Sequence, residues 1–578
     1  MNFVSKRLYR TFLGLFFGIL GVALLFKEVI AAFPDPVAWA DYTDAPLIYW
    51  IVNWGYHVLF ELRQPLSFWN ANSFYPHQLT LAYSDSILSI QLFFAPLRFL
   101  GVNPLMALYL SLGGVCILGF LLTQYGLYRL NIFSTAEVIF IAFAAHFGLS
   151  MVVFFVHYQL FGFQIAPAFF IFFYLYLRDY QLKDLLITLS LYVFGVLFAM
   201  YLAPMLFTIA LISGIPLVLI RLRKRKPIKY IQDIGLRGPL IAAGSAFILY
   251  WIQFRPYLEV GNNFPAHSLA EKRVYSANLS SLITGISFFS KWYSSYAKDI
   301  YGAWEYEYFP GLVLLGLSVL FVMLLFIYIL RKKKNSFAEL DPNLLLYLSI
   351  VFISSIVLSW GPLYKPDHTI KLPYYYLSKI ILGLNSVRAP GRFGMFIGLP
   401  LGVFAVYSLR LLIDNKKWRQ VVASFFLCLL MVESLTAFPA YPFQLDPEGV
   451  YSSISQEIPS GTPLIELPVS GKDSIESARI ASEQLKESTF YWGWLVTGYG
   501  GQTTPEFQEL LNLDKDVQND DSSPQVIITF AEKYKIHYLL IHFDRYNPSV
   551  KESWKQVLKQ SGGTVIFQRG DTTFFRLR

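Results

Sequence analysis

The feature that most constrains this chain is a succession of long apolar runs. A helix needs roughly 20 mostly apolar residues to cross the hydrocarbon core of a bilayer. The chain has 578 residues, of which 55% are hydrophobic and only 15% are charged. We find eleven runs that satisfy this requirement, at residues 8–26, 105–127, 133–155, 160–177, 185–200, 203–220, 240–254, 311–330, 344–360, 393–412 and 421–438. The sequence therefore predicts an α-helical polytopic membrane protein with about eleven transmembrane helices.

The basic residues indicate how the chain is oriented in the membrane. A basic segment precedes the first run, and since no small-residue cleavage site follows, we interpret residues 8–26 as a membrane helix and not a signal peptide. Cytoplasmic loops are enriched in Lys and Arg, and a cytoplasmic N-terminus places the basic clusters 221–229, 331–334 and 416–419 on that same side. This distribution explains the formal net charge of +9 without a nucleic-acid partner. The C-terminus and the long loops 31–104, 255–310 and 361–392 are then expected outside.

The composition changes after the last run to sequence rich in Pro, Ser, Asp and Glu. We therefore predict a transmembrane domain at residues 1–438 and a soluble extracytoplasmic α/β domain at residues 439–578. Within the latter we expect strands at 462–469 and 536–541, helices at 475–486 and 526–535, and a hairpin formed by 565–568 and 574–577. Both cysteines, Cys116 and Cys428, lie in apolar runs, so nothing supports a disulfide framework or a Cys-based metal site.

Two carboxylates stand near the start of the first outer loop. Asp41 and Asp44 precede an apolar, Trp-containing helix that is predicted from Pro46 onward. A carboxylate at the outer membrane surface can take the proton of an attacking hydroxyl. Asp is also a common helix N-cap, so capping and catalysis are equally supported for Asp44. Asp41 has no capping role, although exposed loop carboxylates are common.

Short motifs follow one another through the outer loops and into the tail. They are Phe74-Tyr75-Pro76-His77, Leu81-Ala82-Tyr83-Ser84-Asp85, Tyr275-Ser276-Ala277-Asn278-Leu279, Glu305-Tyr306-Glu307-Tyr308-Phe309-Pro310-Gly311, Trp360-Gly361-Pro362, Val387-Arg388-Ala389-Pro390-Gly391-Arg392-Phe393, Ile465-Glu466-Leu467-Pro468 and Thr497-Gly498-Tyr499-Gly500-Gly501. Together with the Asp41-x-x-Asp44 pair, their order resembles that of bacterial members of the GT-C superfamily. Those proteins are polytopic glycosyltransferases that use polyprenyl-phosphate-linked sugars. The resemblance covers nearly the whole chain and rests on the order and spacing of the motifs.

The resemblance implies a catalytic carboxylate in the first outer loop, which points to Asp41 and Asp44. Glycosyl transfer also needs a cation to stabilise the departing lipid phosphate. Arg388 and Arg392 suit this role because Arg matches phosphate geometry, and a helix reaching back to Arg388 would place both on one face. Anchoring at the membrane interface is their alternative role. Lys272 and Arg273 are weaker phosphate candidates, with a solvated charge pair as the alternative.

Four further residues are candidates for binding substrate: Asp85, His77, Glu305 and Tyr83. Asp85 could instead cap the following helix, His77 could be structural and Glu305 simply solvated. Metal dependence stays open. Some GT-C enzymes hold a divalent cation, Mg²⁺ or Mn²⁺, with loop carboxylates, and Asp41, Asp44 and Asp85 would supply such oxygen ligands. Other members need no metal.

The leading hypothesis is a glycosyltransferase of the bacterial plasma membrane. It would transfer a sugar from a polyprenyl-phosphate donor to a cell-envelope glycan, lipid or protein, with inversion at the anomeric carbon. A transporter or flippase of lipid-linked glycans would also need aromatic and basic cavity residues, but the sequence shows no internal repeat of the kind common in transporters. A noncatalytic membrane scaffold would leave the loop carboxylates dispensable.

Overall fold

The computed structural model describes most of the chain as two compact units. The described residues are 3–39, 43–224, 237–262, 267–283, 307–330, 340–364, 369–435, 438, 440–446, 448–471 and 474–578. One unit, which we term the membrane unit, comprises Met1–Ala31, Leu110–Arg255 and Pro265–Pro439. The other, the α/β unit, comprises Ala32–Tyr109, Pro256–Phe264 and Ala440–Arg578. Each unit is therefore assembled from segments that are far apart in the sequence.

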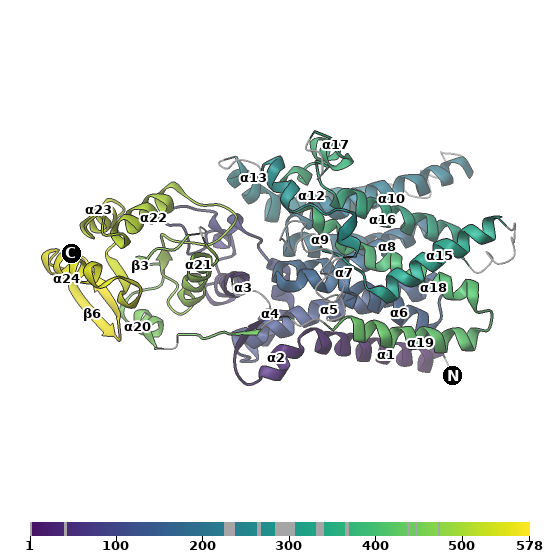
Figure 1. Ribbon diagram of the computed structural model, residues 1–578, viewed down its shortest axis with the longest axis horizontal. Coiled ribbons are helices and arrows are strands. Elements are labelled where there is room, and N and C mark those ends of the chain that lie inside the picture. The colour runs from purple at the N-terminus through teal and green to yellow at the C-terminus, as the bar shows by residue number, and fades with distance from the viewer. Residues whose placement is uncertain are drawn as a thin grey trace. The chain divides into compact units, whose positions relative to one another are not determined.

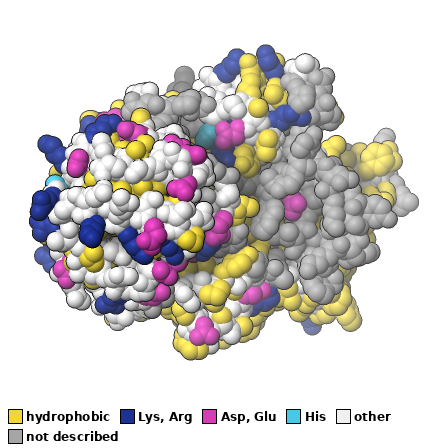
Figure 2. All heavy atoms as spheres, turned by 60° about the vertical axis from the view of Figure 1, so that its left-hand side comes forward, with side chains coloured by type: hydrophobic (Ala, Val, Ile, Leu, Met, Phe, Trp, Pro, Cys, Tyr) yellow, Lys and Arg dark blue, Asp and Glu magenta, His cyan; other side chains and the backbone are white. Residues whose placement is uncertain are grey.

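The membrane unit consists of long helices that run side by side and of shorter helices that connect them (Figure 1). They are α1 (Phe3–Leu25), α2 (Lys27–Ala32), α5 (Pro104–Leu130), α6 (Thr135–Phe147), α7 (Leu149–Val152), α8 (Ala166–Asp179), α9 (Leu182–Phe198), α10 (Leu202–Lys224), α12 (Arg237–Leu249), α14 (Leu269–Val274), α15 (Leu312–Leu330), α16 (Pro342–Ser359), α17 (Pro373–Ile380), α18 (Gly398–Leu412) and α19 (Lys416–Glu433). Hydrophobic side chains such as Val322, Phe326 and Ile329 are exposed on α15. Figure 2 shows exposed hydrophobic side chains in several separate patches, and exposed apolar surface of this kind suits contact with lipid.

Within the described part of the chain, eight helical segments are long and apolar enough to cross a membrane, judged by length and composition. They are Arg7–Leu25, Pro104–Leu130, Thr135–Val156, Tyr158–Asp179, Leu202–Arg223, Leu312–Leu330, Pro342–Ser359 and Pro390–Leu412. Each coincides with one of the predicted runs. The other three runs are helical as well, but α9 has only 17 residues, α12 ends after 13 residues in a π-helical segment, and α19 carries Lys416, Lys417 and Arg419. The protein is a multi-span membrane protein.

A buried cluster of charges joins three helices of the membrane unit. Glu137 on α6 accepts hydrogen bonds from Arg410 of α18 at 2.8 and 3.0 Å, and Arg419 of α19 lies 3.6 Å from the same carboxylate. Both oxygens of Glu137 are thereby used, and one also caps the backbone of Ser134 at 2.7 Å. Because unpaired charges are costly within a membrane protein, this pairing fixes the ends of α6, α18 and α19 against one another.

The α/β unit contains a mixed five-stranded sheet of order β4-β3-β5-β7-β6. β3 (Pro463–Leu467) is parallel to β4 (Trp494–Leu495) and β5 (Tyr538–His542), whereas β7 (Thr572–Arg576) is antiparallel to β5 and β6 (Thr564–Arg569). The remaining helices are α20 (Val450–Glu457), α21 (Ile475–Ser488), α22 (Pro505–Gln518), α23 (Gln525–Lys533) and α24 (Pro548–Gln560). The predicted strands, helices and closing hairpin of the tail are confirmed.

The first long loop, residues 31–104, folds onto this sheet domain. β1 (Val37–Trp39) pairs antiparallel with β2 (Ala440–Pro442), and α3 (Asp44–Tyr56) packs on α21. A π-helical turn, His57–Glu61, continues α3, and the His57 ring stacks on Trp492 with centroids 4.3 Å apart. The apolar helix predicted from Pro46 onward therefore exists, and its partner is the tail. α4 (Gln91–Phe99) and α13 (Arg255–Gly261) belong to the same unit.

Asn72 is the polar centre of this contact. Its side chain is 1% exposed. It accepts a hydrogen bond from the Trp50 indole at 2.8 Å and donates to Gly493 O at 2.9 Å and Ser488 Oγ at 3.1 Å. One amide thus ties α3 to two points of the C-terminal segment. Since buried polar groups need partners, Asn72 makes this packing specific.

We expect Asn72→Ala to destabilise the α/β unit by about 2–4 kcal/mol, because it leaves the Trp50 N–H and the Gly493 carbonyl buried without their partner. The check is denaturant unfolding of the purified full-length protein, followed by Trp fluorescence. Asn512→Ala on the exposed face of α22 is the matched control, with an expected change within about 0.5 kcal/mol. Equal stabilities of the two variants would contradict a central role for Asn72.

A buried ion pair on α21 makes the stability of this unit depend on pH. Lys486 Nζ lies 2.9 Å from Glu487 Oε1, and the Asp446 N–H donates to Glu487 Oε2 at 3.1 Å. Burial raises the pKa of Glu487 to about 7, and the Lys486 ammonium offsets this only in part. Between the ordinary Glu pKa of 4.5 and this value, the folded state holds a proton that the unfolded state has lost. The stability from Glu487 is therefore full below the ordinary pKa and falls as pH rises through 7.

Glu487→Gln remains neutral at every pH, so it should gain stability relative to the wild type between about pH 5 and pH 8, by the order of 3 kcal/mol. The measurement is denaturant unfolding of both proteins at the two pH values. Glu552→Gln, on the exposed face of α24, is the control and should show no such trend. A difference between Glu487→Gln and wild type that is the same at both pH values would show that Glu487 stays ionised in its pair with Lys486.

Candidate functional site

The predicted site residues divide between the two units. Asp44, His77, Tyr83 and Asp85 belong to the α/β unit, and Lys272, Arg273, Arg388 and Arg392 belong to the membrane unit. Asp41 and Glu305 lie outside the described residues. The carboxylates and the cations are therefore described unit by unit.

Asp44 is the first residue of α3, one position after the N-cap residue Thr43. Its side chain is partly exposed, whereas every residue of α3 from Ala45 to Tyr56 is buried. A carboxylate in the first turn interacts favourably with the positive end of the helix dipole. The expected position near the N-cap is confirmed, and a catalytic part stays a prediction.

Two other candidates of the first long loop, His77 and Tyr83, contact the C-terminal segment. His77 Nε2 lies 2.5 Å from Glu506 Oε2 on α22. Tyr83 belongs to the hydrophobic core of the unit, against Phe74 at a centroid distance of 5.2 Å, and its carbonyl accepts from Gly501 N–H at 2.7 Å. Asp85 is partly exposed just before the 3-10 turn Leu88–Ile90, whose N-cap is Ile87. His77 and Tyr83 are thus held by structural contacts, and Asp85 does not occupy the N-cap position.

In the membrane unit, Arg388 forms the most developed polar arrangement. Its Nε donates to Glu271 Oε1 at 2.8 Å and its NH2 donates to Tyr275 Oη at 2.6 Å. The guanidinium carbon lies 4.4 Å above the centre of the Tyr275 ring. The side chain is nevertheless 49% exposed. Glu271 and Tyr275 therefore orient a cation that stays accessible from outside, an arrangement suited to an anionic ligand.

The neighbouring cations differ from Arg388 in exposure. Lys272 is 1% exposed and donates to the side-chain oxygen of Asn385 at 2.7 Å, and burial lowers its pKa. It joins α14 to the loop before Arg388. Arg392 lies with its guanidinium carbon 4.9 Å above the Tyr201 ring, and Arg273 is partly exposed in the last turn of α14. The 3-10 helix that holds Arg392 begins at Pro390, so it does not reach Arg388, and the two arginines contact different neighbours.

One backbone hydrogen bond joins two of the quoted motifs in this unit, and two more join a motif to a residue close to another motif. Gly391 N–H donates to Tyr275 O at 3.0 Å, Ala277 N–H to Ser359 O at 2.8 Å, and Tyr308 N–H to Ser281 O at 3.1 Å. Gly361, at φ +71, lies so close to Ser276 that an added Cβ would clash with its side chain. The sequence reasoning missed Glu271, Asn385 and Tyr201. Only Glu271 left a signal, since it directly precedes the Lys272-Arg273 pair.

A metal site is not assembled in the part of the chain that the structure describes. There, no group of three or more His, Cys, Asp or Glu side chains could hold a metal ion. The proposed oxygen ligands included Asp41, which lies outside the described residues. We therefore derive no step of the reaction through a metal.

Comparison with known proteins gives no match to a family model or to a curated protein sequence. The structure, however, is similar to that of the arabinofuranosyltransferase AftD from Mycobacteria, with a TM-score of 0.56 and 13% sequence identity. The similarity covers 97% of this chain and 39% of AftD, so this chain spans less than half the length of that protein. The archaeal oligosaccharyltransferase AglB from Archaeoglobus fulgidus also aligns, over 97% of this chain and 74% of AglB, with 10% identity and a TM-score of 0.43. The chain therefore shares a fold with AftD over nearly its whole length.

Proposed function

We propose that this protein transfers a sugar from a polyprenyl-phosphate-linked donor to a cell-envelope glycan, lipid or protein on the outer side of a bacterial plasma membrane. The observation that carries the proposal is the fold shared with the arabinofuranosyltransferase AftD over 97% of the chain. The order of motifs along the outer loops supports it. An orientation with eleven spans, a cytoplasmic N-terminus and an external tail is part of the proposal.

The proposed reaction is a single displacement. An acceptor hydroxyl oxygen attacks the anomeric carbon, the bond from that carbon to the phosphate oxygen breaks, and the lipid phosphate leaves with the electron pair. The hydroxyl proton passes to a carboxylate, for which we propose Asp41 or Asp44. Attack opposite the leaving group inverts the anomeric carbon. The increased negative charge on the departing phosphate requires a cation.

Arg388 is the best candidate for that cation. It combines exposure with orientation, since Glu271 and Tyr275 fix its guanidinium while half of the side chain stays accessible. Arg392 and Arg273 are proposed as supporting cations. Lys272 is buried and bonded to Asn385, so we propose that it positions the loop of Arg388 instead of contacting the donor.

Removal of the base should abolish most of the transfer. We expect Asp41→Asn or Asp44→Asn to lower the rate by about 10²–10⁴-fold, the usual contribution of general base catalysis, and the other substitution to have a much smaller effect. The measurement is transfer from radiolabelled polyprenyl-phosphate sugars to a membrane glycan extract by the purified protein in lipid. Glu552→Gln, at an exposed carboxylate of α24, is the control.

Transfer that survives both substitutions would overturn the proposed base. A protein that only moved the labelled lipid between leaflets, without transfer, would instead be a flippase.

Loss of the Arg388 guanidinium should weaken use of the donor. Because a charge-assisted hydrogen bond to phosphate contributes about 1.5–3 kcal/mol, Arg388→Ala should lower kcat/KM for the donor by roughly 10–100-fold. Arg388→Lys should recover only part of this, since the fork geometry is lost. Lys379→Ala removes a cation of α17 that packs on Tyr375 and should have little effect.

Glu271→Gln tests whether Arg388 binds the donor or only holds its own loop in place. It breaks the ion pair with Arg388 but leaves the guanidinium available to the donor, so kcat/KM should stay well above that of Arg388→Ala. Equal losses in Glu271→Gln and Arg388→Ala would show that Arg388 acts only by holding its own loop.

A further inference from the structure

A polar cavity of about 570 Å³ lies within the α/β unit. One wall comes from β2 and the residues after it, including Tyr441 and Phe443, and another from α21, with Arg479, Glu483 and Gln484. Glu466 of β3 and His542 of β5 line the cavity from the sheet. A volume of this size falls within the range of small-molecule sites in proteins, about 300–1,000 Å³.

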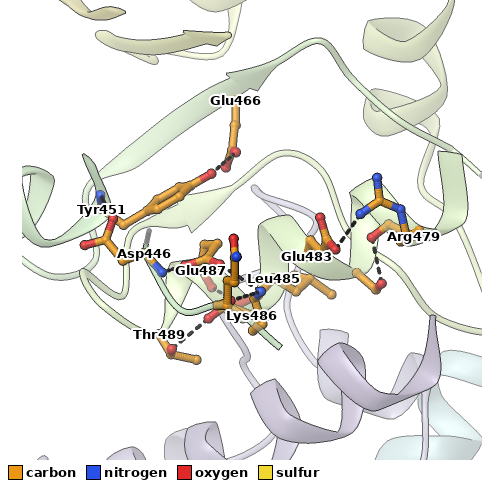
Figure 3. Close-up of polar contacts among 12 residues, drawn as sticks. Asp446, Tyr451, Glu466, Arg479, Glu483, Leu485, Lys486, Glu487 and Thr489 are labelled. Carbon is orange, nitrogen blue, oxygen red and sulfur yellow. Dashed lines mark hydrogen bonds and ion pairs between the residues drawn. The ribbon is translucent and has the colours of Figure 1, made fainter. Parts of the chain in front are cut away.

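Glu466 is the central acceptor of the cavity. Its side chain is fully buried. Its Oε1 accepts a hydrogen bond from the Tyr451 hydroxyl at 2.8 Å and lies 2.9 Å from His542 Nε2. His542 Nδ1 in turn lies 3.1 Å from Thr572 Oγ1. Figure 3 shows Tyr451 pointing its hydroxyl toward Glu466. This chain of contacts fixes the carboxylate and uses only one of its two oxygens.

Two described residues of the lining carry a buried acceptor oxygen without a hydrogen-bond partner. Among the described residues, Glu466 Oε2 and Gln484 Oε1 are buried and have no hydrogen-bond partner, and both residues line the cavity. Burying such a group without a partner is costly, which points to a ligand that supplies hydrogen-bond donors.

Two of the three cations that line the cavity, Arg479 and Lys486, already have partners. Lys486 donates to Gln444 O at 2.6 Å and pairs with Glu487. Arg479 donates to Glu483 at 2.7 Å (Figure 3) and to Glu476 at 3.0 Å. The Gln484 amide donates to Pro468 O at 3.3 Å. A ligand that accepts hydrogen bonds from Arg479, Lys486 or the Gln484 amide would have to break one of these contacts.

The lining is also strongly acidic. Seven carboxylates face three permanent cations, namely Asp446, Glu448, Glu466, Glu483, Glu487, Asp544 and Asp571 against Arg479, Lys486 and Arg545. A phosphate or carboxylate ligand would therefore meet net repulsion. Tyr441, Pro442 and Phe443 add an apolar surface on the same wall. The preferred ligand is rich in donors, carries no negative charge and has an apolar face.

We propose that this cavity binds a neutral saccharide, with its hydroxyls donating to Glu466 Oε2 and Gln484 Oε1 and its ring against the Tyr441–Phe443 wall. A sugar ring offers vicinal hydroxyl donors and an apolar C–H face, which is the combination that the lining selects. The site goes beyond the proposed transferase reaction, because the acidic cavity would repel the phosphate of the lipid donor.

The experiment measures direct binding to the full-length protein in nanodiscs by saturation-transfer NMR and titration calorimetry. The probes are methyl glycosides of neutral hexoses and pentoses, in pyranose and furanose form, with the 6-phosphate of each hexose as its anionic counterpart. We expect at least one neutral glycoside to bind, with a Kd on the order of millimolar, and its phosphorylated counterpart to bind at least about tenfold more weakly.

Two substitutions test the acceptors. Glu466→Gln removes the carboxylate charge, so the unpaired position is taken by an amide N–H donor or by a neutral oxygen. Gln484→Met removes the second acceptor at similar side-chain volume. Each should weaken binding by about tenfold, whereas Glu552→Gln on α24 should leave it unchanged. Thermal unfolding of each variant shows whether it is folded. If Glu466→Gln does not fold, binding by Gln484→Met still decides the test.

The proposal is overturned if no neutral glycoside binds, if the phosphorylated sugars bind as well as the neutral ones, or if folded variants bind like the wild type. No lipid donor is present in the measurement. If no saccharide binds, the proposed transferase function is therefore not contradicted. If the protein shows no sugar transfer, the proposed saccharide site is not contradicted.

Discussion

The α/β unit depends on a contact between two segments that are far apart in the chain. Residues 32–109 and 440–578 form one compact body, held by the pairing of β1 with β2 and by the three hydrogen bonds of Asn72. Closing so long a loop costs entropy that local structure cannot repay, so buried contacts such as α3 on α21 must supply it. Since Asp44 begins α3, the tail fixes the helix that carries a proposed catalytic carboxylate. This gives the tail a structural role.

The sequence predicted the elements whose signal is local. Apolar runs identified the spans because the bilayer demands length and apolarity from each helix alone, and strand and helix periodicity identified β3, β5, α21, α23 and the β6–β7 hairpin. The partners of the first outer loop left no such signal. Nothing near Asn72 or Val37 in the chain indicates Gly493 or Pro442 as a neighbour, because pairing across several hundred residues has no periodicity to read. The composition change after the last apolar run marks where the chain leaves the membrane. It does not indicate which segment packs against the C-terminal residues.

The same limit applies to the candidate site. The residue type alone made Arg388 a phosphate candidate, but the geometry that distinguishes it from Lys272 comes from tertiary contacts. Glu271 and Tyr275 orient Arg388 and leave it accessible, whereas Asn385 engages Lys272 in the interior. The expectation that Arg388 and Arg392 share a helical face depended on a helix that reaches back past Pro390. Pro lacks an N–H and suits a first helical turn, and the helix accordingly begins there.

The two units differ in the charge that they offer to a ligand. In the membrane unit, the buried carboxylate of Glu137 is neutralised by Arg410, and Arg388 keeps an exposed guanidinium that suits an anion. In the α/β unit, Glu466 is as deeply buried as Glu137, yet among the described residues its second oxygen has no hydrogen-bond partner. Folding alone would favour an apolar residue or a paired acid there, because an unsatisfied buried carboxylate oxygen lowers stability. A ligand that donates a hydroxyl to that oxygen recovers this free energy as affinity, whereas a phosphate cannot.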